Sequence, residues 1–456
     1  MAAMSLAPPS SRSPEPRSAI PGFRARLFGY SMYDFANSAF ATTILAVLYN
    51  QYYAREIAAD VRLWGHPVPG ATLWSAWVSA CMIVVVAAAP FLGVLADRRG
   101  RRIRWLAGFW IPGVICTALL YFPERGDWLW GGAIFALAYF AFSATAIFYN
   151  ALLPEVAPPA QLGRVSGIAW GIGYLGGALL LVVNLLMLQK PAWLGFPAGS
   201  LRIQDCFASV AVWWFVFTLP TLWIFRYEGR QAGAGTADSL IRETRESLAQ
   251  VRRTFGHLVR QANLRRFFVA YLLYNDGVQT VVTMASIFGS AELGMEPGQL
   301  VLYFLLIQGT AFVGSIALGW LADRIGHRET LITAVVAWAI LTSWAAGVGI
   351  FGNALREYWI LGGIAGLFLG GIQSCSRSMI ASWIPPRRES EFFGFFSIMT
   401  RVASIFGPLL YGGLLWATGS LRWAILAVTA FFIAGGIVLY GVRTDRIPDE
   451  RADLAR

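Results

Sequence analysis

The sequence has almost no lysine or histidine and few charges of any kind. Charged residues make up 13% of the 456 residues, and Lys190 is the single lysine. A Walker A phosphate loop needs a Gly-Lys-Ser/Thr sequence, so the chain carries no ATP site of that type. The three histidines lie in loops between apolar segments, which argues against a histidine cluster for metal binding or catalysis: His66, His257 and His327.

Cysteine is also scarce, and its spacing suggests no special chemistry. The four cysteines lie in separate apolar segments and form no CxxC pair: Cys81, Cys116, Cys206 and Cys375. A disulfide framework and a zinc site are therefore both unexpected. Without His, Cys or Ser-His arrangements on one face, we predict no enzyme activity, no cofactor and no metal site.

Apolar residues dominate the chain. At 57% hydrophobic, the composition is too apolar for a soluble globular protein. A helix needs about 20 apolar residues to cross the hydrocarbon layer, and lipid leaves unpaired backbone groups no partner. We therefore predict an all-α membrane protein with twelve transmembrane helices, at residues 27–53, 71–94, 105–122, 128–150, 164–189, 205–226, 266–289, 298–321, 330–350, 358–382, 392–416 and 421–443.

The distribution of arginine predicts the orientation in the membrane. Of 36 basic residues, 27 fall on one set of alternate loops and seven on the other set. By the positive-inside rule, both termini and the central loop are expected in the cytoplasm, with the protein in the cell membrane. The net charge of +11 is then a signal of topology, and no nucleic-acid partner is expected.

The chain repeats itself after 226 residues. Gly93-Val-Leu-Ala-Asp97-Arg98 returns as Gly319-Trp-Leu-Ala-Asp323-Arg324, and each copy joins two apolar segments. Internal repeats of this kind are typical of secondary transporters built from two similar halves. We expect a disordered tail (1–26), an N-terminal six-helix bundle (27–226), a cytoplasmic linker with a basic amphipathic helix (227–264), a C-terminal six-helix bundle (265–443) and a second tail (444–456).

Glycines at helical spacing resemble a nucleotide-binding motif. Gly171-Ile-Gly173-Tyr-Leu-Gly176 spells GxGxxG, but it lies inside an apolar span with no preceding strand. Close packing of two helices explains such small residues better than a bound nucleotide.

The two Asp-Arg loops are the predicted cytoplasmic gate. A carboxylate there can accept hydrogen bonds from the unpaired N–H groups at the start of a helix in the other half. We expect Asp97 to face the start of the eleventh span near Phe392, and Asp323 the start of the fifth near Val165. The gate residues are Gly93, Asp97, Arg98, Gly100, Arg101, Gly319, Asp323, Arg324, Gly326 and Arg328.

Four charged residues lie well inside predicted spans, where a charge is costly and therefore a functional candidate. The substrate or coupling candidates are these four charges and three neutral neighbours: Asp34, Asp276, Arg377, Arg401, Asn37, Asn275 and Gln373. Two acids and two bases suit a zwitterion. They also suit a second interpretation, in which the charges pair with each other and hold helices together. Either aspartate could carry a coupling proton.

Longer motifs resemble a known family. The Asp-Arg loops resemble the signature loop of the major facilitator superfamily. Tyr33-Asp-Phe-Ala-Asn-Ser-Ala39, Phe268–Thr280, and Gly371–Ser378 with Ile384-Pro-Pro and Glu391-Phe-Phe-Gly394 resemble its vacuole effluxer-like branch, whose eukaryotic members are autophagy-related amino-acid exporters.

The resemblance implies two pseudo-symmetric bundles that work by alternating access, with the first, fourth, seventh and tenth spans lining a cavity. Asp34, Asp276 and Arg377 would then face water. We expect a monomeric, proton-coupled transporter that exports an amino acid or related zwitterion. Transport of another solute class, such as a sugar, an osmolyte or a drug-like compound, and a substrate-sensing receptor without flux are the alternatives.

Overall fold

The structure is a computed structural model that describes residues 22–63, 66–67, 70–99, 102–227, 256, 260–295, 297–385, 388–402, 407, 410–411, 414, 418 and 420–444. Most of the predicted tails and of the linker 227–264, including its amphipathic helix, lies outside these residues. So do Gly100 and Arg101 of the predicted gate.

The N-terminal half contains the first six predicted spans. The first span combines α1 (Phe23–Ala39), the π-helical η1 (Phe40–Val47), α2 (Tyr49–Tyr52) and the π-helical η2 (Tyr53–Ile57). The other long helices are α3 (Gly70–Arg99), α4 (Arg102–Leu119), α5 (Trp128–Asn150), α7 (Leu162–Gln189) and α8 (Ile203–Ile224). Shorter elements are β1 (Arg62–Leu63), β2 (His66–Pro67), α6 (Leu153–Val156), η3 (Pro159–Gln161) and η4 (Pro191–Leu194).

The C-terminal half contains the other six. Its helices are α10 (Ala262–Ala291), α11 (Pro297–Ile325), α12 (His327–Ala346), α13 (Ala354–Trp383), α14 (Glu389–Val402) and α16 (Leu421–Tyr440). A helix therefore occupies each of the twelve predicted spans. Eight helices of the described part are long and apolar enough to cross a membrane. The helices at the other four predicted spans, namely those at 23–57, α4, α10 and α14, are not among these eight.

Several boundaries differ from the expectation. α1 begins at Phe23, inside the segment predicted as a tail, and α10 begins at Ala262, inside the predicted linker. Asp34 and Asp276 therefore lie four residues further from the start of their helices than the predicted spans place them. Hydropathy marks only the apolar part of a helix, whereas the hydrogen-bonded backbone continues through polar residues at its ends.

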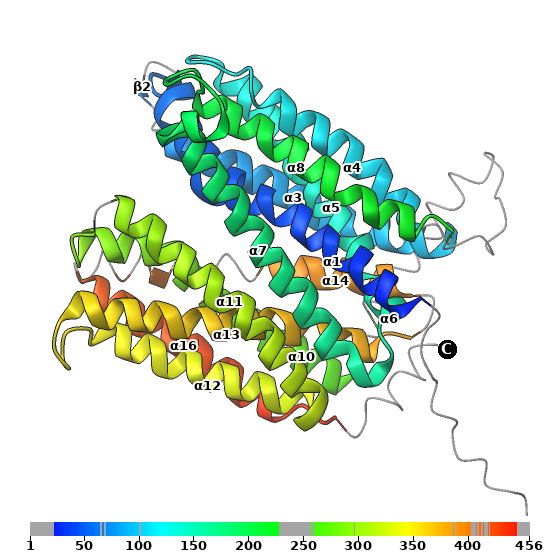
Figure 1. The fold of residues 1–456 in the computed structure, drawn as a ribbon. Helices are drawn as coiled ribbons and strands as arrows, with labels where there is room; N and C mark the ends of the chain where they lie inside the picture. Colours follow the sequence, from blue (N-terminus) through cyan, green and yellow to red (C-terminus); the bar gives the residue numbers. More distant parts are fainter. Residues whose placement is uncertain are drawn as a thin grey trace, which may run out of the picture.

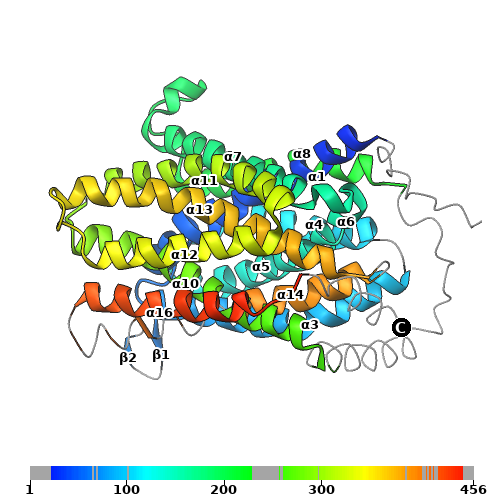
Figure 2. The same cartoon turned by 90° about the horizontal axis from the view of Figure 1, so that it is seen from below.

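The two halves form two bundles that meet at one end of the molecule and separate toward the other (Figure 1). They meet at the end where Asp97 and Asp323 contact the other half, and they diverge toward the end that carries β2. The largest contacts between the halves are those of α7 with α11, α3 with α14 and α7 with α13. α7 and α11 lie side by side in both views (Figure 2).

Glycine allows the helices of the two halves to approach closely. A Cβ atom at Gly319 would overlap the carbonyl oxygen of Gly163, and one at Gly93 would overlap that of Ser390. In the GxGxxG segment, Gly171 faces Ser315 of α11, while Gly173 and Gly176 face α1, so the segment is a packing face. Such small residues permit contact between backbones where lipid provides no hydrophobic driving force.

Candidate functional site

Asp97 at the end of α3 caps the first turn of α14. Its carboxylate accepts hydrogen bonds from the backbone N–H groups of Ser390 (3.1 Å) and Glu391 (2.8 Å), and its side chain is 4% exposed. The N–H groups of a first helical turn have no partner within the helix and favour a negative charge. The predicted contact between Asp97 and the start of the eleventh span is confirmed.

Asp323 at the end of α11 makes the same contact in the opposite direction. Its two oxygens accept hydrogen bonds from the N–H groups of Gly163 (2.8 Å) and Arg164 (2.7 Å), in the first turn of α7. This prediction is also confirmed. Each half therefore caps a helix of the other half at the same end of the molecule.

Arg102, at the start of α4, adds a charge network to the Asp97 contact. Its guanidinium donates to Asp97 Oδ1 (2.9 and 3.1 Å) and to Ser390 Oγ (2.9 Å). It also forms ion pairs with Glu155 and Glu389, one from each half. We did not predict Arg102 as a gate residue, although it follows Gly93 at the spacing at which Arg328 follows Gly319.

Arg328 occupies the corresponding position at the Asp323 contact but has different partners. It forms an ion pair with its neighbour Glu329 (3.1 Å) and donates to the carbonyl oxygen of Tyr440 (2.5 Å). Arg324, also predicted for the gate, is exposed and lies over the ring of Trp320 (3.6 Å). Gly326 adopts φ of 104°, a backbone angle that suits glycine at the turn between α11 and α12. Arg98 belongs to α3, and its side chain lies outside the described part.

Asp34 and Arg377 form an ion pair between the two halves. Arg377 Nη1 on α13 lies 3.1 Å from Asp34 Oδ2 on α1, and the two side chains are 3% and 10% exposed. Arg377 also donates to Ser166 Oγ (2.9 Å), to the Ser166 carbonyl oxygen (2.8 Å) and to Asn150 Oδ1 (3.4 Å). A buried charge needs a partner of opposite sign and saturated hydrogen bonds, and both are present here.

Aromatic rings surround the same guanidinium. Its central carbon lies 5.6 Å from the ring of Tyr30, 5.8 Å from that of Tyr149 and 5.2 Å from that of Trp170. Tyr30 and Tyr149 are stacked, with their centroids 4.4 Å apart. Cations within about 6 Å of an aromatic face are attracted by its quadrupole. Sequence reasoning missed Tyr30 and Trp170, because one aromatic residue among many in apolar spans carries no signal.

The remaining candidates do not join this pair. Asp276 is 2% exposed and accepts a hydrogen bond from the N–H of Gly407 (2.8 Å), within its own half. Asn275 Oδ1 accepts from Gln373 Nε2 (3.4 Å), and Asn37 is half-buried on α1. Arg401 belongs to α14, but its side chain lies outside the described part.

The expectation that Asp34, Asp276 and Arg377 face water is wrong for this conformation. These residues are 7%, 2% and 3% exposed, respectively. Asp34 and Arg377 lie where the two halves meet, and Asp276 lies against Gly407 of its own half. Of the two interpretations left open by the sequence, the pairing of charges with each other holds for Asp34 and Arg377 in this state.

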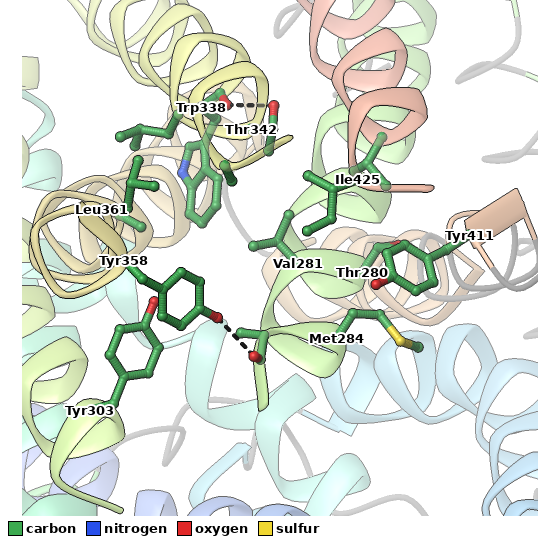
Figure 3. A pocket seen from close by; sticks show the side chains of 15 residues that line it. Thr280, Val281, Met284, Tyr303, Trp338, Thr342, Tyr358, Leu361, Tyr411 and Ile425 are labelled. Carbon is green, nitrogen blue, oxygen red and sulfur yellow. Dashed lines mark hydrogen bonds between the residues drawn. The ribbon is translucent and has the colours of Figure 1, made fainter. Parts of the chain in front are cut away.

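A cavity inside the C-terminal half lies apart from these charges. Side chains such as Val281, Trp338 and Tyr358 surround it, between α10, α12, α13 and α16 (Figure 3). Its volume is about 60 Å³. All the side chains that line it belong to the C-terminal half, so the cavity does not lie between the halves. We therefore do not assign it to the substrate.

Two family models match the sequence. The family described as "Vacuole effluxer Atg22 like" matches residues 159–451, which is more than half of the chain. The family described as "Major Facilitator Superfamily" matches residues 4–181.

Curated relatives carry names from the same families. The chain is 29% identical to the MFS-type transporter YxiO of Bacillus subtilis (strain 168), with 90% of this chain and 92% of that protein covered. It is 27% identical to autophagy-related protein 22-1 of Penicillium rubens, with 59% and 47% covered. It is 25% identical to autophagy-related protein 22 of Pichia angusta, with 77% and 71% covered. The matched region thus spans about half the length of the Penicillium protein.

Three solved structures of similar fold carry titles that name transporters. The human organic anion transporter MFSD10 (TETRAN) superposes with a TM-score of 0.64 at 16% identity, covering 91% of this chain and 98% of that chain. A bacterial homologue of ferroportin in the outward-facing state has a TM-score of 0.66 at 14% identity, with 92% and 98% covered. The proton:xylose symporter XylE has a TM-score of 0.65 at 13% identity, with 92% and 94% covered.

These identities show the fold alone, and the family follows from the sequence match. Two six-helix halves, a repeated Asp-Arg loop and reciprocal helix caps accompany that match. The family and the fold are those of transporters and not of enzymes. The chain belongs to the vacuole effluxer Atg22-like family of the major facilitator superfamily and is an MFS-type transporter.

Proposed function

We propose that the protein exports an amino acid or a related zwitterion across the cell membrane by alternating access, in exchange for protons. The observation that carries this proposal is the ion pair between Asp34 and Arg377. It joins the two halves at the closed end, and its two charges complement the amine and the carboxylate of a zwitterion.

Alternating access requires contacts that hold one end closed and break when that end opens. The Asp97 and Asp323 caps and the Asp34–Arg377 pair all connect the two halves at the same end. With the Asp-Arg loops in the cytoplasm, as the arginine distribution predicts, this conformation faces outward. Opening the cytoplasmic end would separate all three contacts together.

Proton coupling is assigned to Asp34 rather than to Asp276. The partner of Asp34 is a charged group of the other half, so a change of state must alter its charge environment. Asp276 instead accepts a backbone hydrogen bond within its own half, which rigid-body motion of the halves leaves intact. A proton and the substrate amine would compete for the Asp34 carboxylate, and this competition couples their movements.

Substrate exchange in proteoliposomes tests this function. Amino acids, sugars and osmolytes are first screened for stabilisation of the purified protein, because a ligand stabilises the state that binds it. We then expect counterflow of the labelled zwitterion that stabilises it. Counterflow of a sugar alone would favour another solute class, which the fold permits, since its structural neighbours include a transporter of organic anions and a symporter of xylose. Binding without counterflow would favour a receptor.

Asp34→Asn tests the coupling. The variant imitates the protonated carboxyl, so gradient-driven accumulation should be lost while exchange continues at reduced affinity, by about 1.5–3 kcal/mol for a lost charged hydrogen bond. Asp276→Asn is the matched control and should keep uphill transport. Wild-type accumulation in Asp34→Asn would contradict the assignment.

Cysteine labelling tests the orientation. Cysteines introduced at positions 15, 240 and 450 should resist membrane-impermeant thiol reagents in intact cells, and one at position 62 should react. Labelling of position 240 from outside would contradict the proposed topology.

A further inference from the structure

We propose that Tyr30, Tyr149 and Trp170 form, with Asp34, a cation site that Arg377 occupies in this conformation and that the amine of the transported solute occupies in the opposite one. The inference rests on the proposed function, because it assumes that the closed end opens. We call these four residues of the N-terminal half the aromatic box. The inference adds to the proposed function that this box recognises an ammonium or guanidinium group of the solute.

The box belongs entirely to the N-terminal half. Tyr30 and Asp34 lie one helical turn apart on α1, Tyr149 lies on α5 and Trp170 on α7. Asp34 and Tyr149 are buried, and Trp170 is half-buried with no described partner for its Nε1. Three aromatic rings and one carboxylate contact the same guanidinium, and such an environment attracts cations and offers little to a neutral or anionic group.

Arg377 comes from the other half, and every partner described for its guanidinium lies in the N-terminal half. These partners are the Asp34 carboxylate, two oxygens of Ser166, Asn150 Oδ1 and the three aromatic rings. An arginine that served to brace α13 would be expected to bond to its own bundle. The guanidinium is instead held like a ligand, attached to the C-terminal half only through its side-chain stem.

Separation of the halves at this end would withdraw Arg377 and leave Asp34 without a counter-charge among aromatic rings. The carboxylate that remains beside the rings favours a proton or a cation in place of the guanidinium. A solute with an ammonium or guanidinium group fits both the carboxylate and the rings. A solute without such a group would leave the carboxylate unpaired, so the box selects for the cation and not for the carboxylate of the solute.

When the side chain of Arg377 is removed, the box should bind a guanidinium compound from solution. In purified Arg377→Ala, methylguanidinium at non-denaturing millimolar concentrations should raise the melting temperature in a saturable manner, relative to the same concentration of sodium chloride. The wild type should not respond, because Arg377 already fills the site. Arg125→Ala is the control for loss of an arginine, since it removes the partner of Asp60 in an exposed pair (2.5 Å). It should not respond either.

Two further variants identify the site. Adding Asp34→Asn to Arg377→Ala should abolish the response, and adding Trp170→Leu should weaken binding of methylguanidinium about tenfold. A response of the wild type or of Arg125→Ala as large as that of Arg377→Ala, or no response in Arg377→Ala, would overturn the proposal. If Arg377→Ala does not fold, Arg377→Gln provides the same test with a side chain of similar length.

A measurement on the wild type separates this inference from the proposed function. If an amino acid shows counterflow, its amide, which keeps the amine, should compete for exchange, and its N-acetyl derivative should fail to compete. Competition by the N-acetyl derivative as strong as by the parent would refute the box while leaving zwitterion transport intact. Absence of any counterflow would refute the proposed function, and the methylguanidinium response would still decide whether the box binds cations.

Discussion

The Asp97 and Asp323 contacts come from two copies of one repeated sequence, but different side chains surround them. In both, an aspartate at the end of one helix accepts two backbone N–H groups from the first turn of a helix in the other half. In both, a glycine one turn earlier, Gly93 or Gly319, brings the two backbones together. The backbone part of the contact is therefore duplicated along with the sequence.

The side chains around the two caps differ. Arg102 lies among Asp97, Glu155 and Glu389, whereas its counterpart Arg328 pairs with Glu329 and the backbone of Tyr440. The sequence suggests why: Pro386 stands where the first half has Glu155, so the second copy lacks that acid. The comparison indicates that one contact closes this end with a charge network and the other with a helix cap alone.

The largest expected effect is that of Arg102→Gln, which leaves three carboxylates without their shared cation. Breaking a buried network of this kind costs about 3–5 kcal/mol, so the closed state should lose about 100-fold or more in population. A reporter cysteine at Ala96, which is fully buried, should then react faster with a thiol reagent in a chain whose four native cysteines are replaced by serine. Arg104→Gln, on an exposed position of the same helix, is the control. Equal labelling rates in the two variants would show that Arg102 does not stabilise the closed state.

The next largest difference is between Asp97→Asn and Asp323→Asn. The first loses both a helix cap and a charged hydrogen bond to Arg102, about 3 kcal/mol in total, and the second loses a cap worth about 1 kcal/mol. Both should favour the state open at this end and reduce the transport rate with near-normal expression. Labelling of cysteines at the equivalent positions Ala96 and Ala322 measures the difference. A larger increase in labelling for Asp323→Asn than for Asp97→Asn would contradict this prediction.

Gly93→Ala and Gly319→Ala should have similar effects, because the backbone approach is the part that is duplicated. A methyl group at either position overlaps a carbonyl oxygen of the other half, and overpacking costs about 1–3 kcal/mol. Both variants should open this end to thiol reagents by a similar factor. Gly108→Ala is the control, since nothing lies within 4 Å of its added Cβ. Opening in only one of the two glycine variants would show that the approach is not equivalent.

The smallest effect is expected for Arg328→Gln. Its ion-pair partner Glu329 is 42% exposed, and such pairs contribute about 0–1 kcal/mol. The Ala322 reporter should therefore label at nearly the wild-type rate. An increase as large as that of Arg102→Gln would mean that the second contact also depends on a charge network.

The twelve spans were predictable because lipid acts on each segment separately. A run of apolar residues must form a helix in the bilayer whatever the rest of the chain does. The helix ends were less predictable, as α1 and α3 show: both continue through polar residues beyond the apolar run. The caps by Asp97 and Asp323 were predictable because the repeat itself marked them and because a helix start always offers free N–H groups.

The sequence by itself determined the class of the protein, its helical spans and its division into two similar halves, because these depend on local composition and on repetition. Only the tertiary structure decided which charges meet. Asp34 and Arg377 are 343 residues apart in the chain, and no local pattern tells that Arg377 reaches Asp34 while Asp276 bonds to a backbone N–H group. Ion pairing depends on distances of a few ångströms between side chains, and these distances are set only when the helices of both halves have packed together.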